Sequence, residues 1–253
     1  MARQASFLKL DGRIGDVSFY QTGTDGFLAR QKGGVSAQRI KNDPSFARTR
    51  ENGAEFGNAN EAARLMRTAL RALILGAADS RMSSRLSSKM VEVVKADTTS
   101  TRGKRNVLDG ETILLQGFEF NANGLLGQTL YAPYNITVNR ALGKATVDLP
   151  EFVPANMIAA PGGATHARLI SGAASIDFEH KTYVVDTAQS ADIALIPQQH
   201  PIVSMLFDLD PGTTHPLFVV LGIEFFQEVN GAKYPLKNGA FNALAIVYVD
   251  PGT

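Results

Sequence analysis

Hydrophobic and polar positions in the first thirty residues follow the short alternating runs that are typical of strands. The apolar runs lie at 7–10, 17–20 and 27–29, and turn-forming residues separate them at Asp11-Gly12 and across 22–26. Three strands of this length make at best a marginal sheet by themselves. We therefore expect this hairpin segment to pair with another surface, either of this chain or of a second copy.

The pattern changes twice before residue 106. Residues 32–57 are mostly polar, carry five Lys or Arg and contain Gly33-Gly34 and Asn52-Gly53, which predicts an extended basic arm. Asn58 followed by Glu61 has the spacing of a helix N-terminus, and apolar residues then recur at helical intervals up to Gly76. A second helical pattern follows, so residues 58–97 are predicted to form a helical hairpin.

Residues 98–106 form a polar and basic linker, and the remainder, 107–253, has β character. Apolar runs recur from residue 112 to residue 249, the first of them at 112–115. Tight-turn signals separate these runs at Asn123-Gly124, Pro211-Gly212 and Asn230-Gly231. The predicted fold class is α+β, with an N-terminal β-hairpin and basic arm (1–57), a two-helix element and a C-terminal antiparallel β-sandwich.

The formal net charge of +1 conceals a strong asymmetry along the chain. Residues 1–105 contain 19 Lys and Arg against 10 Asp and Glu, whereas residues 106–253 contain 6 against 14, so the two parts carry +9 and −8. A basic segment of this kind favours an anionic partner. Because every other copy of the protein offers an acidic surface, head-to-tail self-association is one interpretation. Nucleic acid is the alternative partner.

The residue inventory offers little for catalysis. The chain has no Cys, which excludes disulfides, thiolate nucleophiles and Cys-based metal sites. His180 lies near Asp177, and His215 lies near Asp208 and Asp210, but strand alternation and a charged turn explain these two groups more simply than chemistry does. We expect neither an enzyme nor a cofactor nor a metal.

No run of apolar residues is long enough to span a membrane, and the N-terminus lacks the pattern of a signal peptide. These features predict cytoplasmic synthesis. The final location stays open and includes a released or extracellular assembly.

Four segments carry a resemblance: GRIGDVSFY, RTRENGAEFG, MIAAPGGATH and GIEFFQEVNGAKYPLKNGAFNAL. Over nearly its whole length the chain resembles a family of uncharacterised bacterial proteins of similar size. The resemblance implies no enzymatic activity, no cofactor and no catalytic residues. It favours a bacterial structural or surface-associated role.

Taken together, the pattern predicts a structural protein that self-assembles into a filament, tube or shell, of which a phage-like tail tube or capsid component is one version. The residues expected to dock the strands are Ile14, Val17, Phe19, Tyr20, Phe27 and Leu28. Those expected to contact acidic residues of the next copy are Arg48, Arg50, Arg64, Arg67 and Arg71. The alternatives are a nucleic-acid-binding protein that uses the basic half, and a carbohydrate-binding sandwich to which Tyr131 and Tyr134 contribute.

Overall fold

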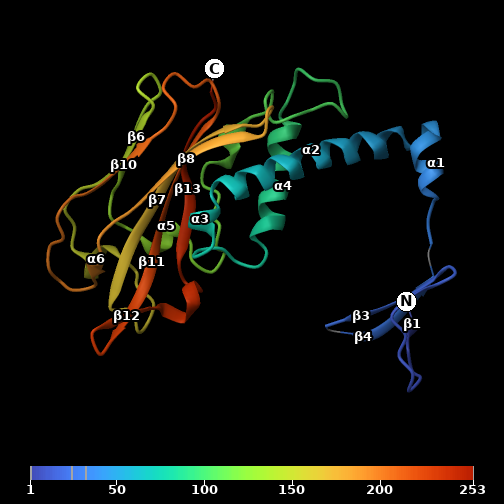
Figure 1. Cartoon of the computed structure of the whole chain (residues 1–253), viewed down its shortest axis with the longest axis horizontal. Coiled ribbons are helices and arrows are strands. Elements are labelled where there is room, and N and C mark those ends of the chain that lie inside the picture. Colours follow the sequence, from blue (N-terminus) through green and yellow to red (C-terminus); the bar gives the residue numbers. More distant parts are fainter. Residues whose placement is uncertain (1, 24, 32, 253) are drawn as a thin grey trace. The chain divides into compact units, whose positions relative to one another are not determined.

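The computed structural model describes residues 2–23, 25–31 and 33–252 and has a mixed α+β fold built on antiparallel sheets (Figure 1). It divides into two compact units, Met1–Arg50 and Glu51–Thr253. The predicted fold class is confirmed. The boundary between the units differs from the predicted segment ends, because a helix begins within the segment predicted to be extended.

The first unit contains a small antiparallel sheet in the order β1-β4-β3-β2. Its strands are β1 (Ala2–Arg3), β2 (Gly12–Ile14), β3 (Val17–Thr22) and β4 (Gly26–Gln31). Ile14 pairs with Val17, so a two-residue turn joins β2 to β3, and Gly15 takes the left-handed φ of +57° that such a turn requires. The strands predicted at 17–20 and 27–29 are confirmed as β3 and β4. The strand predicted at 7–10 is wrong, because β2 begins at Gly12, where a turn was predicted, and the short strand β1 forms the opposite edge of the sheet.

The predicted extended arm is wrong from residue 37 onward, where the chain is helical. Helix α1 (Ala37–Asn42) begins after Ser36, whose hydroxyl accepts a hydrogen bond from the Arg39 N–H at 3.3 Å. Asp43 caps the following 3₁₀ turn (Pro44–Phe46) in the same way, through the Ser45 N–H at 2.9 Å. The polar composition that predicted an extended arm therefore includes two N-capping residues, Ser36 and Asp43, and Pro44 at the first position of the 3₁₀ turn.

Helix α2 (Ala47–Ala69) is 23 residues long and continues through the predicted starting point at Asn58. Asn58 is not a cap, because its side chain donates to the Arg105 carbonyl at 2.9 Å. Gly53 and Gly57 each cost the helix about 1 kcal/mol relative to alanine. Burial of one helix face offsets this cost, and the buried side chains are Glu55, Ala59, Ala62, Ala63, Met66 and Ala69.

The predicted helical hairpin is otherwise present in the second unit. The short helix α3 (Arg71–Ile74) follows α2, and α4 (Met82–Lys95) supplies the second long helix. Met66 of α2, Leu86 of α4 and Leu70, which joins α2 to α3, are fully buried in one core cluster. The helical periodicity in the sequence therefore identified this core face correctly.

The remainder of the second unit forms two antiparallel sheets. The large sheet contains β7 (His166–Asp177), β8 (Thr182–Gln189), β9 (Ile193–Ala194), β11 (Leu217–Val229), β12 (Ala232–Pro235) and β13 (Ala243–Asp250). The small sheet contains β5 (Asn135–Asn139), β6 (Lys144–Leu149) and β10 (Val203–Asp208). The connections include α5 (Leu126–Thr129), α6 (Pro154–Met157) and 3₁₀ turns at Thr112–Leu115 and Leu236–Gly239. Residues 112–115 were expected to be a strand.

The large sheet is covered on both faces. Alternate residues of β11, such as Phe218 and Val220, pack with the helices, whereas Val219 and Leu221 pack against the small sheet. A strand buried on both faces needs apolar residues at every position, which accounts for the almost unbroken apolar run of β11. The predicted sandwich is therefore correct, and the helices form an additional layer on its outer side (Figure 1).

One buried asparagine closes a gap in the large sheet. Strand β11 pairs with β13 up to Ile223 and with β12 from Phe226 onward, so its residues at 224 and 225 have no strand on that side. The Asn242 side chain fills the gap, because its Oδ1 accepts the Phe225 N–H at 3.0 Å and its Nδ2 donates to the Gly76 carbonyl at 2.8 Å. This residue thereby ties the sheet to the end of the helical layer.

Candidate functional site

The register of the N-terminal sheet sorts the predicted docking residues onto two faces. Residues directly opposite each other in an antiparallel sheet share a face, and the cross-strand pairs include Ile14 with Val17, Phe19 with Ala29 and Gln21 with Phe27. We call the surface of Ile14, Val17, Phe19, Phe27 and Ala29 the apolar face. Four of the six predicted docking residues therefore lie together.

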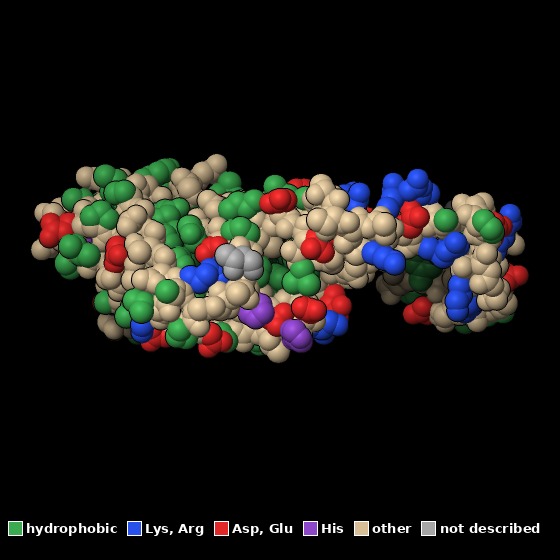
Figure 2. All heavy atoms as spheres, turned by 90° about the horizontal axis from the view of Figure 1, so that it is seen from above, with side chains coloured by type: hydrophobic (Ala, Val, Ile, Leu, Met, Phe, Trp, Pro, Cys, Tyr) green, Lys and Arg blue, Asp and Glu red, His purple; other side chains and the backbone are tan. Residues whose placement is uncertain are grey.

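The opposite surface is basic. Tyr20 pairs with Leu28, and Leu28 pairs with Arg3, while Ser18 lies between Arg13 and Arg30 in the same register. We call the surface with Arg3, Arg13 and Arg30 the arginine face. Figure 2 shows Lys and Arg side chains gathered over this unit. Tyr20 and Leu28, the other two predicted docking residues, belong to this face.

The N-terminal sheet has almost no core of its own. Among the described residues of Met1–Arg50, Leu28 is the only one that is buried, while the side chain of Ile14 is 62% exposed. Phe7 and Leu8, in the segment after β1, are also exposed. A sheet is normally stabilised by a second layer packed on its apolar face. The described residues of this unit do not supply that layer.

The five arginines predicted to form an electrostatic contact have different roles. Arg50 donates to the carbonyls of Ile40 and Asp43 at 2.7 and 3.0 Å, so it holds α1 and the 3₁₀ turn against α2. Arg67 donates to the Ser83 hydroxyl at 2.7 Å and so joins α2 to α4. Arg48, Arg64 and Arg71 are exposed. Two of the five arginines, Arg50 and Arg67, therefore make contacts within the chain.

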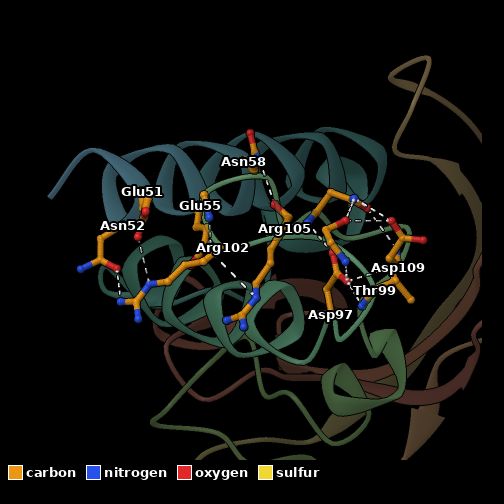
Figure 3. Close-up of polar contacts among 12 residues, drawn as sticks. Glu51, Asn52, Glu55, Asn58, Asp97, Thr99, Arg102, Arg105 and Asp109 are labelled. Atoms are coloured by element: carbon orange, nitrogen blue, oxygen red, sulfur yellow. Dashed lines mark hydrogen bonds and ion pairs between the residues drawn. The ribbon is translucent and has the colours of Figure 1, made fainter. Parts of the chain in front are cut away.

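The predicted linker is an ordered loop that Asp97 holds in place (Figure 3). The buried Asp97 carboxylate accepts hydrogen bonds from the backbone N–H groups of Ser100 at 2.9 Å, Thr99 at 2.8 Å and Asn106 at 3.2 Å. Burial alone would raise the pKa of Asp97, but these hydrogen bonds outweigh it and keep the pKa well below its usual range. A carboxylate bound in this way is a structural group.

The same loop is attached to α2, as Figure 3 shows. The buried Glu55 accepts the Gly103 N–H at 2.8 Å, and its Oε1 lies 4.0 Å from the Arg105 Nε. Arg102 contacts Glu51 at 3.5 Å and the Asn52 side chain at 2.9 Å. These acidic and amide partners satisfy much of the positive charge that the sequence places here. Arg102 and Arg105 therefore attach this loop to α2.

The structure brings His215 to Asp177 and His180 at one end of the large sheet, whereas Asp208 pairs with Lys144 instead. The buried Asp177 Oδ2 lies 2.7 Å from the His180 Nδ1 and 3.7 Å from the His215 Nε2. Figure 2 shows histidines gathered beside acidic side chains. The hydrogen bond to Asp177 raises the pKa of His180. The nearby Ser175 hydroxyl contacts Thr213 at 3.2 Å, so no serine is paired with a histidine in this cluster.

The structure does not assemble the other predicted sites. Tyr131 and Tyr134 are both exposed, and no ring contact joins them among the described residues. Across residues 2–23, 25–31 and 33–252 there is no group of three His, Asp or Glu side chains suited to a metal ion. Within the same residues, no helix is both long enough and apolar enough to cross a lipid bilayer.

Comparisons of the chain with protein-family models, with curated proteins and with solved structures give no match. The resemblance to a bacterial family therefore stays a prediction. The function has to be argued from the geometry of the two units.

The sequence analysis overlooked Glu224. It is the only charged residue in the apolar run from Leu217 to Phe226, and this isolated charge is the signal that could have identified it. The carboxyl group is half-buried, and desolvation raises its pKa.

Proposed function

We propose that the protein is a structural subunit that assembles into a homopolymer, in which the N-terminal sheet of one copy docks on the second unit of the next copy. The observation that carries this proposal is the apolar face, with its exposed Ile14 and half-buried Phe19 and Phe27, in a unit whose only buried described residue is Leu28. Covering such a face removes apolar surface from water, which drives association.

The mode of docking differs from simple strand addition. The central strands β3 and β4 carry most of the predicted docking residues, and each already pairs with a strand on both of its edges. An added strand from another copy would find only the short strands β1 and β2 at the sheet edges. Packing of the apolar face against a neighbouring copy therefore supports the proposal better than edge pairing does.

The charges of the two units favour a head-to-tail contact. Residues 1–50 contain nine Lys and Arg against four Asp and Glu, and residues 51–253 contain sixteen against twenty, so the units carry +5 and −4. Opposite charges steer the first unit of one copy to the second unit of another. Such a heterologous contact generates a filament or tube unless its rotation closes a ring or shell.

Two adjacent residues of β2 provide a matched test. Ile14 lies on the apolar face, Arg13 lies on the arginine face, and both are exposed, so neither Ile14→Gln nor Arg13→Gln removes a buried group. Full-length wild-type protein and both variants would be compared by negative-stain electron microscopy and sedimentation velocity at low and high salt, with circular dichroism to confirm folding. We expect Ile14→Gln to abolish assembly and Arg13→Gln to alter only its salt dependence.

A monodisperse wild-type monomer at both salt concentrations would contradict the proposal. Equal assembly by wild-type protein and Ile14→Gln would remove the apolar face from the mechanism. Binding of mixed-sequence DNA or RNA that weakens steeply with salt, and that Arg13→Gln reduces, would instead favour the nucleic-acid alternative.

A further inference from the structure

Glu224 lies where the helical layer stops covering the large sheet. On β11 it follows Phe218, Val220 and Gly222 in alternation, so it shares the face that packs with the helices. Two cavities, of about 340 and 350 Å³, lie beside it. Ala72, Leu73 and Gln189 contribute to the first, and Phe226, Pro235 and Asn238 contribute to the second.

The arginine across the sheet from Glu224 is already bound to another carboxylate. Arg168 is directly opposite Glu224 on β7, yet its guanidinium donates to the Asp192 Oδ1 at 2.6 and 2.9 Å and lies 4.8 Å from the centre of the Phe226 ring. Lys233 also binds Asp192, at 2.8 Å. Asp192 thus binds two cations. The Glu224 carboxyl group, in contrast, has no hydrogen bond or ion pair with the described residues of the chain.

A half-buried carboxyl group without a partner is costly, and such groups call for an explanation. Burial raises the pKa of Glu224, and the charge of Arg168 only partly opposes this effect. A cation brought to the carboxylate would relieve the cost by pairing with the ionised form.

The backbone at Gly76 approaches the Glu224 carboxyl group closely on one wall of the cleft. A Cβ atom at Gly76 would lie 2.6 Å from the Glu224 Oε1, so the carboxyl group, which ends a flexible side chain, would have to move. On the other wall, Lys237, Asn238 and Gly239 have φ values of 45°, 53° and 78°. Two successive non-glycine residues in the left-handed region are uncommon, and such strain concentrates at functional sites.

We propose that the cleft at Glu224 binds a small organic amine, with the ammonium group paired to the Glu224 carboxylate and the apolar chain of the amine against Phe226 and Pro235. The cavity volume of about 350 Å³ is in the range of small-molecule sites. This site lies wholly within the second unit and does not depend on self-assembly. A Lys or Arg side chain of a second copy would present the same chemistry, and the test separates these two sources.

The test uses n-butylammonium chloride as the probe and the full-length chain as the receptor. Binding would be followed by isothermal titration calorimetry and by the NMR shift of the Glu224 carboxyl carbon. Glu224→Gln keeps the shape and removes the charge, and Glu228→Gln on the same strand is the matched control, since Glu228 is exposed. We expect Glu224→Gln to weaken binding by at least about tenfold and Glu228→Gln to leave it unchanged.

Asp192→Asn provides an independent variant. Loss of the Asp192 charge releases Arg168 to pair with its cross-strand neighbour Glu224, so we expect weaker butylammonium binding although Glu224 is intact. No wild-type binding at millimolar concentration, or equal binding by wild-type protein and Glu224→Gln, would overturn the proposal. Loss of self-association in Glu224→Gln without butylammonium binding to wild type would also overturn it and assign the cleft to a side chain of a second copy.

Discussion

Replacement of Asn242 by alanine tests how the large sheet is joined to the helical layer. The variant removes the acceptor of the buried Phe225 N–H and the donor to the Gly76 carbonyl. A buried N–H left unpaired costs about 1–3 kcal/mol, and the partly buried carbonyl adds about 1 kcal/mol. Because both groups lie where no strand can replace the side chain, we expect Asn242→Ala to lower the free energy of unfolding by about 2–4 kcal/mol.

Asn139 offers a matched control at the end of β5. Its Oδ1 also accepts a backbone N–H, from Leu142 at 3.1 Å, but this hydrogen bond is exposed and water can replace it. We expect Asn139→Ala to cost less than about 1 kcal/mol. Urea denaturation followed by circular dichroism would measure both variants, with the slope m unchanged from wild type. Equal losses in the two variants would refute the argument that the gap between β12 and β13 makes Asn242 essential.

Three further predictions concern single groups in the second unit. Gly222→Ala should destabilise the protein by about 1–3 kcal/mol, because its Cβ would lie 2.5 Å from the Ala243 carbonyl oxygen; a thermal midpoint equal to that of wild type would contradict this. Asp97 has a lowered pKa, so its contribution to stability is complete above its unfolded pKa of about 3.9 and declines as the pH falls toward the folded value. The stability difference between wild type and Asp97→Asn, from urea denaturation at several pH values, should therefore be constant in neutral solution and shrink in acid. Asp177 raises the pKa of His180, so the contribution of His180 to stability is present below about pH 6.5 and is lost as the pH rises through its pKa in the folded protein. His180→Ala should therefore lower the free energy of unfolding at about pH 5.5 but not in alkaline solution.

Local patterns in the sequence were sufficient to predict much of the fold. The apolar runs at 17–20 and 27–29 predicted the hairpin of β3 and β4, and the helical spacing of apolar residues such as Met66, Leu70 and Leu86 identified the buried face of the helices. The apolar run of β11 was assigned correctly to a central strand. In each case the information lies within a few residues, because the period of apolar positions directly reflects which face is buried.

The errors have a common physical origin in polar residues that serve two purposes. Ser36 and Asp43 resembled loop residues, but they cap a helix and a 3₁₀ turn. The segment after Asp97 resembled a linker, but the Asp97 carboxylate accepts hydrogen bonds from backbone N–H groups that a flexible linker would expose to water. The same short polar side chains form these local hydrogen bonds in loops and at helix starts, so residue type alone does not distinguish the two cases.

The candidate sites were predictable to a lesser degree. The apolar face could be anticipated from alternation, whereas the roles of Arg50 and Arg67 depend on carbonyl and hydroxyl partners at other places in the chain. The cleft at Glu224 arises where β7, β11 and the end of α3 meet. Contacts between segments this distant in sequence produce no local pattern from which the cleft could be predicted.

The difference between local and distant pairing has a consequence for synthesis of the chain. The N-terminal sheet makes only local pairings, because β2, β3 and β4 pair with their neighbours in sequence and β1 pairs with β4. The buried side chains of α2 and α4, in contrast, pack on β7, β11 and β13. Strand β13 ends at Asp250. A nascent chain therefore exposes the apolar side chains of this helix pair until β13 has been synthesised, and exposed apolar surface of this kind makes a chain prone to aggregation.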